Sequence, residues 1–208
     1  MTIMNISKMI LAAFFCVLPL LAYTAPQFDV KQSTIPTEER RQQAILGVRE
    51  FRCSYTLPNA PEYLQVIVES YKFGRLSRRY RAAHAGNFGR TNGTVSLAWL
   101  PKQREMVTII ENGEVYSPFS KRLLIDRSEF DDVFDGNHGF KVVEEREGMI
   151  PLMGISGQRG NKIGSGFRTP EEFLEVCKRA NAKFCWIVYL HIDDKDNSGG
   201  HPRFEDGR

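Results

Sequence analysis

The histidines and cysteines of this chain are its best-suited residues for metal, redox or nucleophilic chemistry. The histidines have no spacing that would place two of them on one helical face, so we expect no metal site. The GxSxG, HExxH and Walker sequences and a CxxC pair are also absent from the sequence. We therefore predict no catalytic residues, no cofactor and no metal. The four histidines are His84, His138, His191 and His201.

The cysteines suggest a disulfide instead. Cys16 lies in an apolar leader, and three cysteines remain after it, Cys53, Cys177 and Cys185. In an oxidising compartment such a set favours one disulfide and one unpaired thiol. The alternative is three free, buried thiols.

A second candidate site is the basic, aromatic stretch between Arg75 and Arg104, which contains no acidic residue. Cations interleaved with rings suit single-stranded RNA or another acidic partner. The alternative is a solvated basic loop. The predicted contact residues are Arg75, Arg78, Arg79, Tyr80, Arg81, Phe88 and Arg90.

The amino-terminal segment has the pattern of a signal peptide. Lys8 precedes an uncharged run from Met9 to Ala22, which is shorter than a membrane span. We expect residues 1–25 to be removed and the chain to be secreted to the extracellular space, without stable membrane association. On such a chain, Asn92 in Asn-Gly-Thr is a candidate glycosylation site.

The rest of the chain is expected to form one domain. The leader carries one lysine and no acid, so its removal leaves the chain nearly neutral. A hydrophobic content of 42% supports a folded core. We predict a lead-in with a short helix over residues 26–47, a single domain over 48–192 and a disordered tail over 193–208.

Within that domain the clearest predicted helix runs from Asn59 to Gly74. Its apolar residues recur at steps of three and four, which places them on one face. A second helix is expected from Thr169 to about Ala180, because Thr169 to Glu172 form a capping box with proline at the first helical position. Strands are expected at 48–55, 94–100, 105–111, 114–119, 122–125, 140–144, 150–155 and 184–192, with a hairpin turn at Asn112-Gly113. The fold class is α+β, with an amphipathic helix packed on a curved antiparallel sheet.

Phe51-Arg52-Cys53, the predicted helix after it and a late cysteine form one arrangement. It resembles the secreted ribonuclease-like effectors of powdery mildew fungi, which carry an aromatic-x-Cys motif at this place. Those effectors look like the small fungal guanine-specific ribonucleases. The resemblance implies a ribonuclease-like fold and a disulfide from Cys53 to Cys177, with Cys185 as the competing partner.

The same resemblance implies that catalysis has been lost. The position of the family's glutamate base falls at or near Lys121, and that of its arginine falls on Lys141. The position of its acid histidine falls on residues 156–158, which are Ser-Gly-Gln. Only His84 matches an additional histidine of the enzymes, and one histidine is not an acid–base pair.

We therefore expect a secreted fungal effector for virulence, a catalytically inactive ribonuclease-like module that binds a host protein or RNA outside or inside the host cell. One alternative is an active secreted hydrolase or ribonuclease that uses His84. Another is a bacterial periplasmic domain without catalytic function.

Overall fold

The computed structural model describes residues 28–86, 89–100, 105–113, 115–122, 136–157, 166–182 and 184–193. The expected leader at 1–25 and nearly all of the expected disordered tail at 193–208 lie outside these residues. Phe88 and most of the strand expected at 122–125 also lie outside them.

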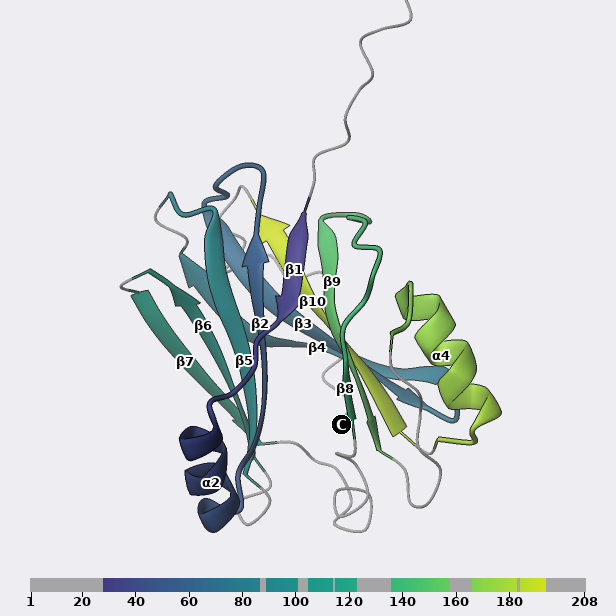
Figure 1. The fold of residues 1–208 in the computed structure, drawn as a ribbon. Coiled ribbons are helices and arrows are strands. Elements are labelled where there is room, and N and C mark those ends of the chain that lie inside the picture. Colours follow the sequence, from purple (N-terminus) through teal and green to yellow (C-terminus); the bar gives the residue numbers. More distant parts are fainter. Residues whose placement is uncertain are drawn as a thin grey trace, which may run out of the picture.

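Two five-stranded antiparallel sheets form the body of the protein (Figure 1). The expectation of an α+β protein with antiparallel strands is confirmed, although the strands form two sheets. Sheet A has the order β1 (Asp29–Gln32), β2 (Arg49–Thr56), β5 (Asn92–Leu100), β6 (Glu105–Asn112) and β7 (Val115–Arg122). Sheet B has the order β4 (Arg75–Gly86), β3 (Tyr63–Lys72), β10 (Phe184–Asp193), β9 (Met149–Gly157) and β8 (Gly136–His138).

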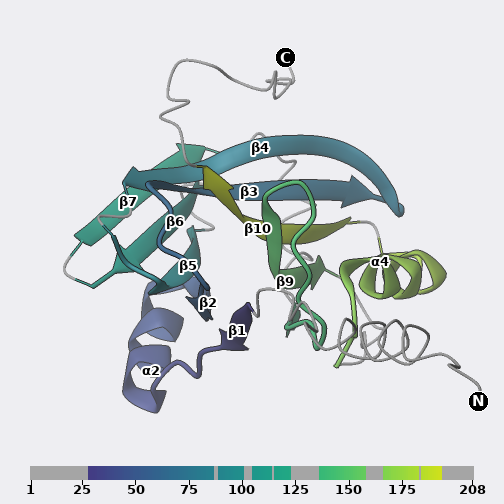
Figure 2. The same ribbon diagram turned by 90° about the horizontal axis from the view of Figure 1, so that it is seen from above.

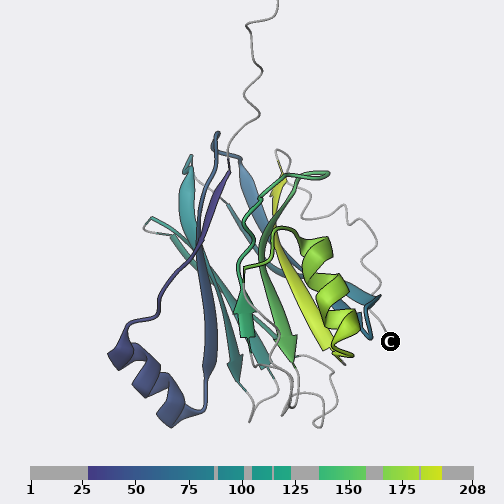
Figure 3. The same cartoon turned by 45° about the vertical axis from the view of Figure 1, so that its right-hand side comes forward.

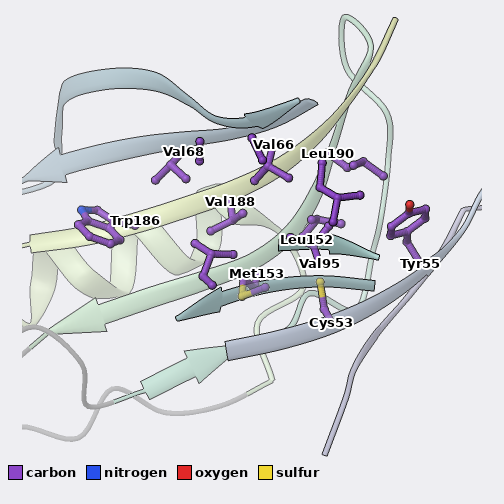
Figure 4. Packing of buried hydrophobic residues seen from close by; sticks show 14 of the residues in the cluster. Cys53, Tyr55, Val66, Val68, Val95, Leu152, Met153, Trp186, Val188 and Leu190 are labelled. Atoms are coloured by element: carbon purple, nitrogen blue, oxygen red, sulfur yellow. The ribbon is translucent and has the colours of Figure 1, made fainter. Parts of the chain in front are cut away.

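The main core lies between the two sheets. Figure 4 shows Cys53, Tyr55 and Val95 of sheet A facing side chains of β3, β9 and β10. From β10, alternate residues point into this core, because successive side chains of a strand lie on opposite faces. Those residues are Trp186, Val188 and Leu190, each at most 1% exposed.

The helix expected from Asn59 to Gly74 is wrong, because residues 63–72 form strand β3. β3 lies between β4 and β10 and is covered on both faces, so seven successive residues are buried. A strand buried on both faces loses the apolar–polar alternation that identifies strands. Gly74 ends a tight β3–β4 turn instead of a helix, and both Phe73 and Gly74 have positive φ angles.

Most of the other expected elements are present. The strand at 48–55, the Asn112-Gly113 hairpin and the strand at 184–192 match β2, the β6–β7 turn and β10. Thr169 caps the second helix, α4 (Pro170–Arg179), by accepting a hydrogen bond from the Glu172 backbone N–H at 3.3 Å. The strand expected at 140–144 is wrong, because these residues form no strand.

Helix α4 covers the outer face of sheet B, which is the face turned away from sheet A (Figures 1 and 3). Its Phe173 is fully buried over Gly154 of β9, where a β-carbon would lie 2.9 Å from the ring. A second apolar cluster fills this interface and includes Cys177, Cys185 and Ile187. Sheet B therefore separates two apolar cores.

The expected short helix before Gly47 is present as α2 (Thr37–Leu46), although Pro36 occupies its N-cap. No residue of α2 is buried. Polar contacts with β2 hold it, since Glu39 is ion-paired with Arg52 at 2.6 Å and the Gln43 side-chain amide donates to Glu50 at 2.5 Å.

Candidate functional site

The three described cysteines are free and buried. Cys53 lies in the core between the sheets, whereas Cys177 and Cys185 lie in the cluster under α4. Neither Cys53–Cys177 nor Cys53–Cys185 is bonded, because sheet B stands between the partners. The disulfide expected from the ribonuclease resemblance is therefore absent. Burial raises the pKa of the Cys53 thiol to about 12, which makes it a poor nucleophile near neutral pH.

The predicted basic surface is split between two faces of one strand. Residues 75–86 form β4, an edge strand of sheet B that arches from the side of β7 toward α4 (Figure 2). In the β3–β4 ladder, Arg79 lies opposite Glu69 and Arg81 lies opposite Ile67, and the side chains of both arginines are on the outer face. Arg78 points to the opposite face, because side chains alternate along a strand.

The other predicted contact residues do not restore one surface. Tyr80 packs against the inter-sheet core, and burial raises the pKa of its hydroxyl. Its ring is therefore not free to stack on a base. Arg75 and Arg90 are exposed, and Arg90 lies beside the β6–β7 turn at Gly113. Asn92 is exposed at the start of β5, so its side chain is accessible for the glycosylation expected there.

A cavity of about 340 Å³ opens on the outer face of sheet B. The β3–β4 hairpin, the segment before β9, strands β9 and β10 and the first turn of α4 surround it. Apolar side chains form its walls, and these are Leu76, Val142, Met149, Pro151 and Pro170. Its polar lining consists of Glu69, Tyr71, Arg79, Glu144, Arg146, Glu147, Thr169, Glu171 and Tyr189. We call this cavity the outer pocket.

A buried carboxylate, Glu69 of β3, forms the floor of the outer pocket, with its side chain 4% exposed. The Tyr71 hydroxyl donates to it at 2.6 Å, and the Arg79 Nε donates at 2.7 Å. The Arg79 Nη2 also donates to it, and the Tyr189 hydroxyl is hydrogen-bonded to it. Both Glu69 oxygens are thus occupied by donors.

The two tyrosines of this floor stay protonated over a wide pH range. Burial, followed by the hydrogen bond to Glu69 and its charge, raises the pKa of Tyr71. Burial and the nearby Glu69 carboxylate also raise the pKa of Tyr189. Each hydroxyl therefore remains a hydrogen-bond donor to Glu69.

The rim of the outer pocket carries more negative than positive charge. Arg146 donates to Glu171 of α4 at 2.5 Å. Burial opposes ionisation of Glu171, but hydrogen bonds from its backbone N–H and from Thr169, together with Arg146, lower its pKa. Glu144 and Glu147 are exposed on the rim, and no described residue makes an ion pair with either.

A tight turn positions Glu147. Arg146 and Met149 exchange backbone hydrogen bonds of 3.0 and 2.9 Å, and both residues between them have positive φ angles. Glu147 therefore stands at the tip of a two-residue turn, beside Gly148. The Glu-Gly dipeptide before an apolar strand is a local signal for this turn that our sequence reasoning missed.

Neither His84 nor His191 completes an acid–base pair with Glu69. His84 of β4 and His191 of β10 both lie opposite Gln65 of β3 in the sheet. His84 also stacks on Tyr63, with ring centroids 5.7 Å apart. Gln65 is four residues from Glu69, which corresponds to about 13 Å along a strand. Neither histidine lines the outer pocket.

The positions that match the ribonuclease catalytic residues do not converge. Lys121 lies on β7 of sheet A, while Ser156 lies on β9 of sheet B. Lys141 lies outside the strands, where its backbone N–H donates to Phe167 at 3.0 Å. We therefore base no candidate site on these positions.

Among the described residues, no group of three or more His, Cys, Asp or Glu side chains is placed to hold a metal ion. No helix in that part of the chain is long and apolar enough to cross a membrane. Comparisons with family models, with curated proteins and with solved structures found no match to this chain.

Proposed function

We propose that this protein is a non-catalytic binding module whose outer pocket receives a positively charged group carried on an apolar body. The observation that carries the proposal is the combination of apolar walls with the two exposed rim carboxylates, Glu144 and Glu147. A guanidinium or ammonium group would meet these carboxylates, while its aliphatic stem would contact the walls.

The same chemistry favours a protein partner over RNA. A phosphate at the outer pocket would be repelled by Glu144 and Glu147. Arg79, one of the predicted RNA contacts, is ion-paired with Glu69, and Arg78 points to the other face of the sheet. We therefore propose that the ligand is an arginine or lysine side chain presented by another protein.

A binding role also fits the floor of the outer pocket better than catalysis does. Acid–base catalysis needs a group that can accept a proton and a second group that can donate one near the same atom. Glu69 has its oxygens occupied, and His84 is placed about 13 Å along the sheet from it. His84 does not line the outer pocket, so this pocket gives no support to the alternative of a hydrolase that uses it.

We retain secretion as part of the proposal, on the basis of the Lys8 and Met9–Ala22 pattern. Export would place the outer pocket where it can meet proteins of another cell, as expected of an effector. The proposal does not depend on a ribonuclease-like fold, because the Asn59–Gly74 helix and the Cys53 disulfide on which that resemblance rested are absent.

Short peptides that differ in one charge test this function. The full chain is titrated with an acetylated, amidated peptide containing one arginine between alanines, and with the same peptide containing citrulline, the neutral analogue of arginine. Calorimetry measures both affinities. We expect the arginine peptide to bind and the citrulline peptide to bind more weakly, because only the former gains the two ion pairs.

Matched variants test whether the arginine peptide binds at the outer pocket. Glu144→Gln with Glu147→Gln should weaken arginine-peptide binding about 2- to 30-fold, since each exposed ion pair contributes about 0.2–1 kcal/mol. Glu175→Gln is the control, because Glu175 is an exposed acid of α4 that does not line the outer pocket. Equal binding of both peptides, or an equal effect of the control, would exclude the proposed cation site.

A further inference from the structure

Cys177 and Cys185 are brought together where α4 turns back onto β10. Cys177 lies in the last turn of α4, and Cys185 is the second residue of β10. The Ala182 backbone N–H donates to the Cys177 carbonyl oxygen at 2.8 Å, which closes the turn after the helix. Both cysteine side chains lie in the apolar cluster under α4 and are 0% and 1% exposed.

The two thiols also contact each other, since the side chains of Cys177 and Cys185 are hydrogen-bonded. Cys185 points toward α4 because its neighbour Trp186 points into the core between the sheets. Cys53 is separated from both by sheet B. We infer that Cys177 and Cys185 are a disulfide-forming pair, which links the end of α4 to β10 when the chain folds under oxidising conditions.

The reaction is an ordinary thiol–disulfide exchange. An external disulfide, such as oxidised glutathione, reacts with one cysteine thiolate to form a mixed disulfide and releases one glutathione. The second cysteine thiolate then attacks the mixed disulfide and releases the other glutathione. The two protein thiols lose two protons and two electrons, one sulfur–sulfur bond forms in the protein, and the external disulfide is reduced to two thiols. The exchange occurs before burial is complete, because the folded cluster shields both sulfurs from the oxidant.

The bond would fix α4 in place over sheet B. The first turn of the same helix brings Thr169, Pro170 and Glu171 to the outer pocket. Cys177 and Cys185 are close in sequence, so the closed loop is short and the entropic gain is modest. We expect a rise in Tm of about 5–10 °C in the oxidised form.

Refolding under a defined redox poise tests the inference. The full chain, with Cys16→Ser to remove the leader thiol, is denatured and reduced and then refolded with a reduced and oxidised glutathione couple. It is alkylated, and its peptides are mapped under non-reducing conditions. We expect a Cys177–Cys185 bridge in the refolded protein, with Cys53 alkylated only after unfolding.

Single substitutions test whether the disulfide joins Cys177 to Cys185 or includes Cys53. Cys177→Ser and Cys185→Ser should each abolish the difference in Tm between oxidised and reduced protein, whereas Cys53→Ser should retain it. If a variant fails to fold, the peptide map of the wild-type protein and the Tm values of its oxidised and reduced forms still show whether Cys177 and Cys185 are bridged. A bridge that includes Cys53, or a fully reduced folded protein after oxidative refolding, would overturn the inference.

Discussion

Replacing Glu69 by glutamine should destabilise the protein substantially while leaving its shape unchanged. The side chain is 4% exposed and accepts hydrogen bonds from Tyr71, Arg79 and Tyr189. Glutamine has almost the same volume but carries only one acceptor oxygen and adds an NH2 group. At least one of the three donors then loses its acceptor, and Arg79 loses its ion pair.

The expected loss follows from these contacts. A hydrogen bond to a charged group contributes about 1.5–3 kcal/mol, and removing one partner of a fully buried pair costs about 3–5 kcal/mol. Arg79 is 42% exposed, so water stabilises its unpaired charge and reduces the cost. We therefore expect Glu69→Gln to lower the free energy of unfolding by about 2–4 kcal/mol.

Urea denaturation of the two forms measures this difference. Glu175→Gln serves as the control, because a substitution at an exposed acid without such contacts should change stability by no more than about 0.5 kcal/mol. A loss of the same small size for Glu69→Gln would refute the hydrogen-bonded floor of the outer pocket.

Two further predictions concern the same face of sheet B. Gly154→Ala should destabilise by about 1–3 kcal/mol, because the new β-carbon would lie 2.9 Å from the buried Phe173 ring, whereas Gly139→Ala, with a nearest contact of 3.7 Å, should have little effect in the same thermal unfolding assay. Stability should be retained below the ordinary tyrosine pKa of 10.0 and should fall as the pH rises above it, because Tyr71 and Tyr189 have raised pKa values in the folded state. Glu69→Gln should make that fall shallower in a pH series of urea titrations, and an unchanged slope would contradict the assigned contacts.

Local signals were sufficient for several elements of this fold. Thr169 followed by Pro170 predicted α4, and the Asn112-Gly113 pair predicted the β6–β7 turn. The run Phe184–Ile192 predicted β10 from its β-branched and aromatic residues. Each of these signals lies within a few residues of the structure that it specifies.

β3 could not be recognised in the same way. Leu64, Ile67, Val68 and Tyr71 fit the spacing of a helix, yet they lie on two faces of a strand that is covered on both sides. The burial of Ile67 on the face opposite Val68 depends on elements far away in the sequence. Gly74 is a plausible end for either structure, so it did not decide between them.

The candidate site was missed for the same reason. Glu69 and Tyr71 were assigned to a helix, and Tyr189 lies more than a hundred residues later on the neighbouring strand. Only the pairing of β3 with β4 and β10 brings Arg79 and Tyr189 to this carboxylate. The basic stretch was found, but its alternation between two faces follows from β4 being a strand.

Tyrosine ring signals in an NMR titration report whether a cationic ligand binds in the outer pocket. The full chain is titrated with the arginine peptide, and the signals of Tyr71 and Tyr189 are compared with that of Tyr55, which lies in the core between the sheets. We predict saturable shifts of Tyr71 and Tyr189, no shift of Tyr55 and a much weaker response to the citrulline peptide. Unchanged Tyr71 and Tyr189 signals at saturating arginine peptide, or equal shifts with citrulline, would contradict the proposed cation-binding pocket.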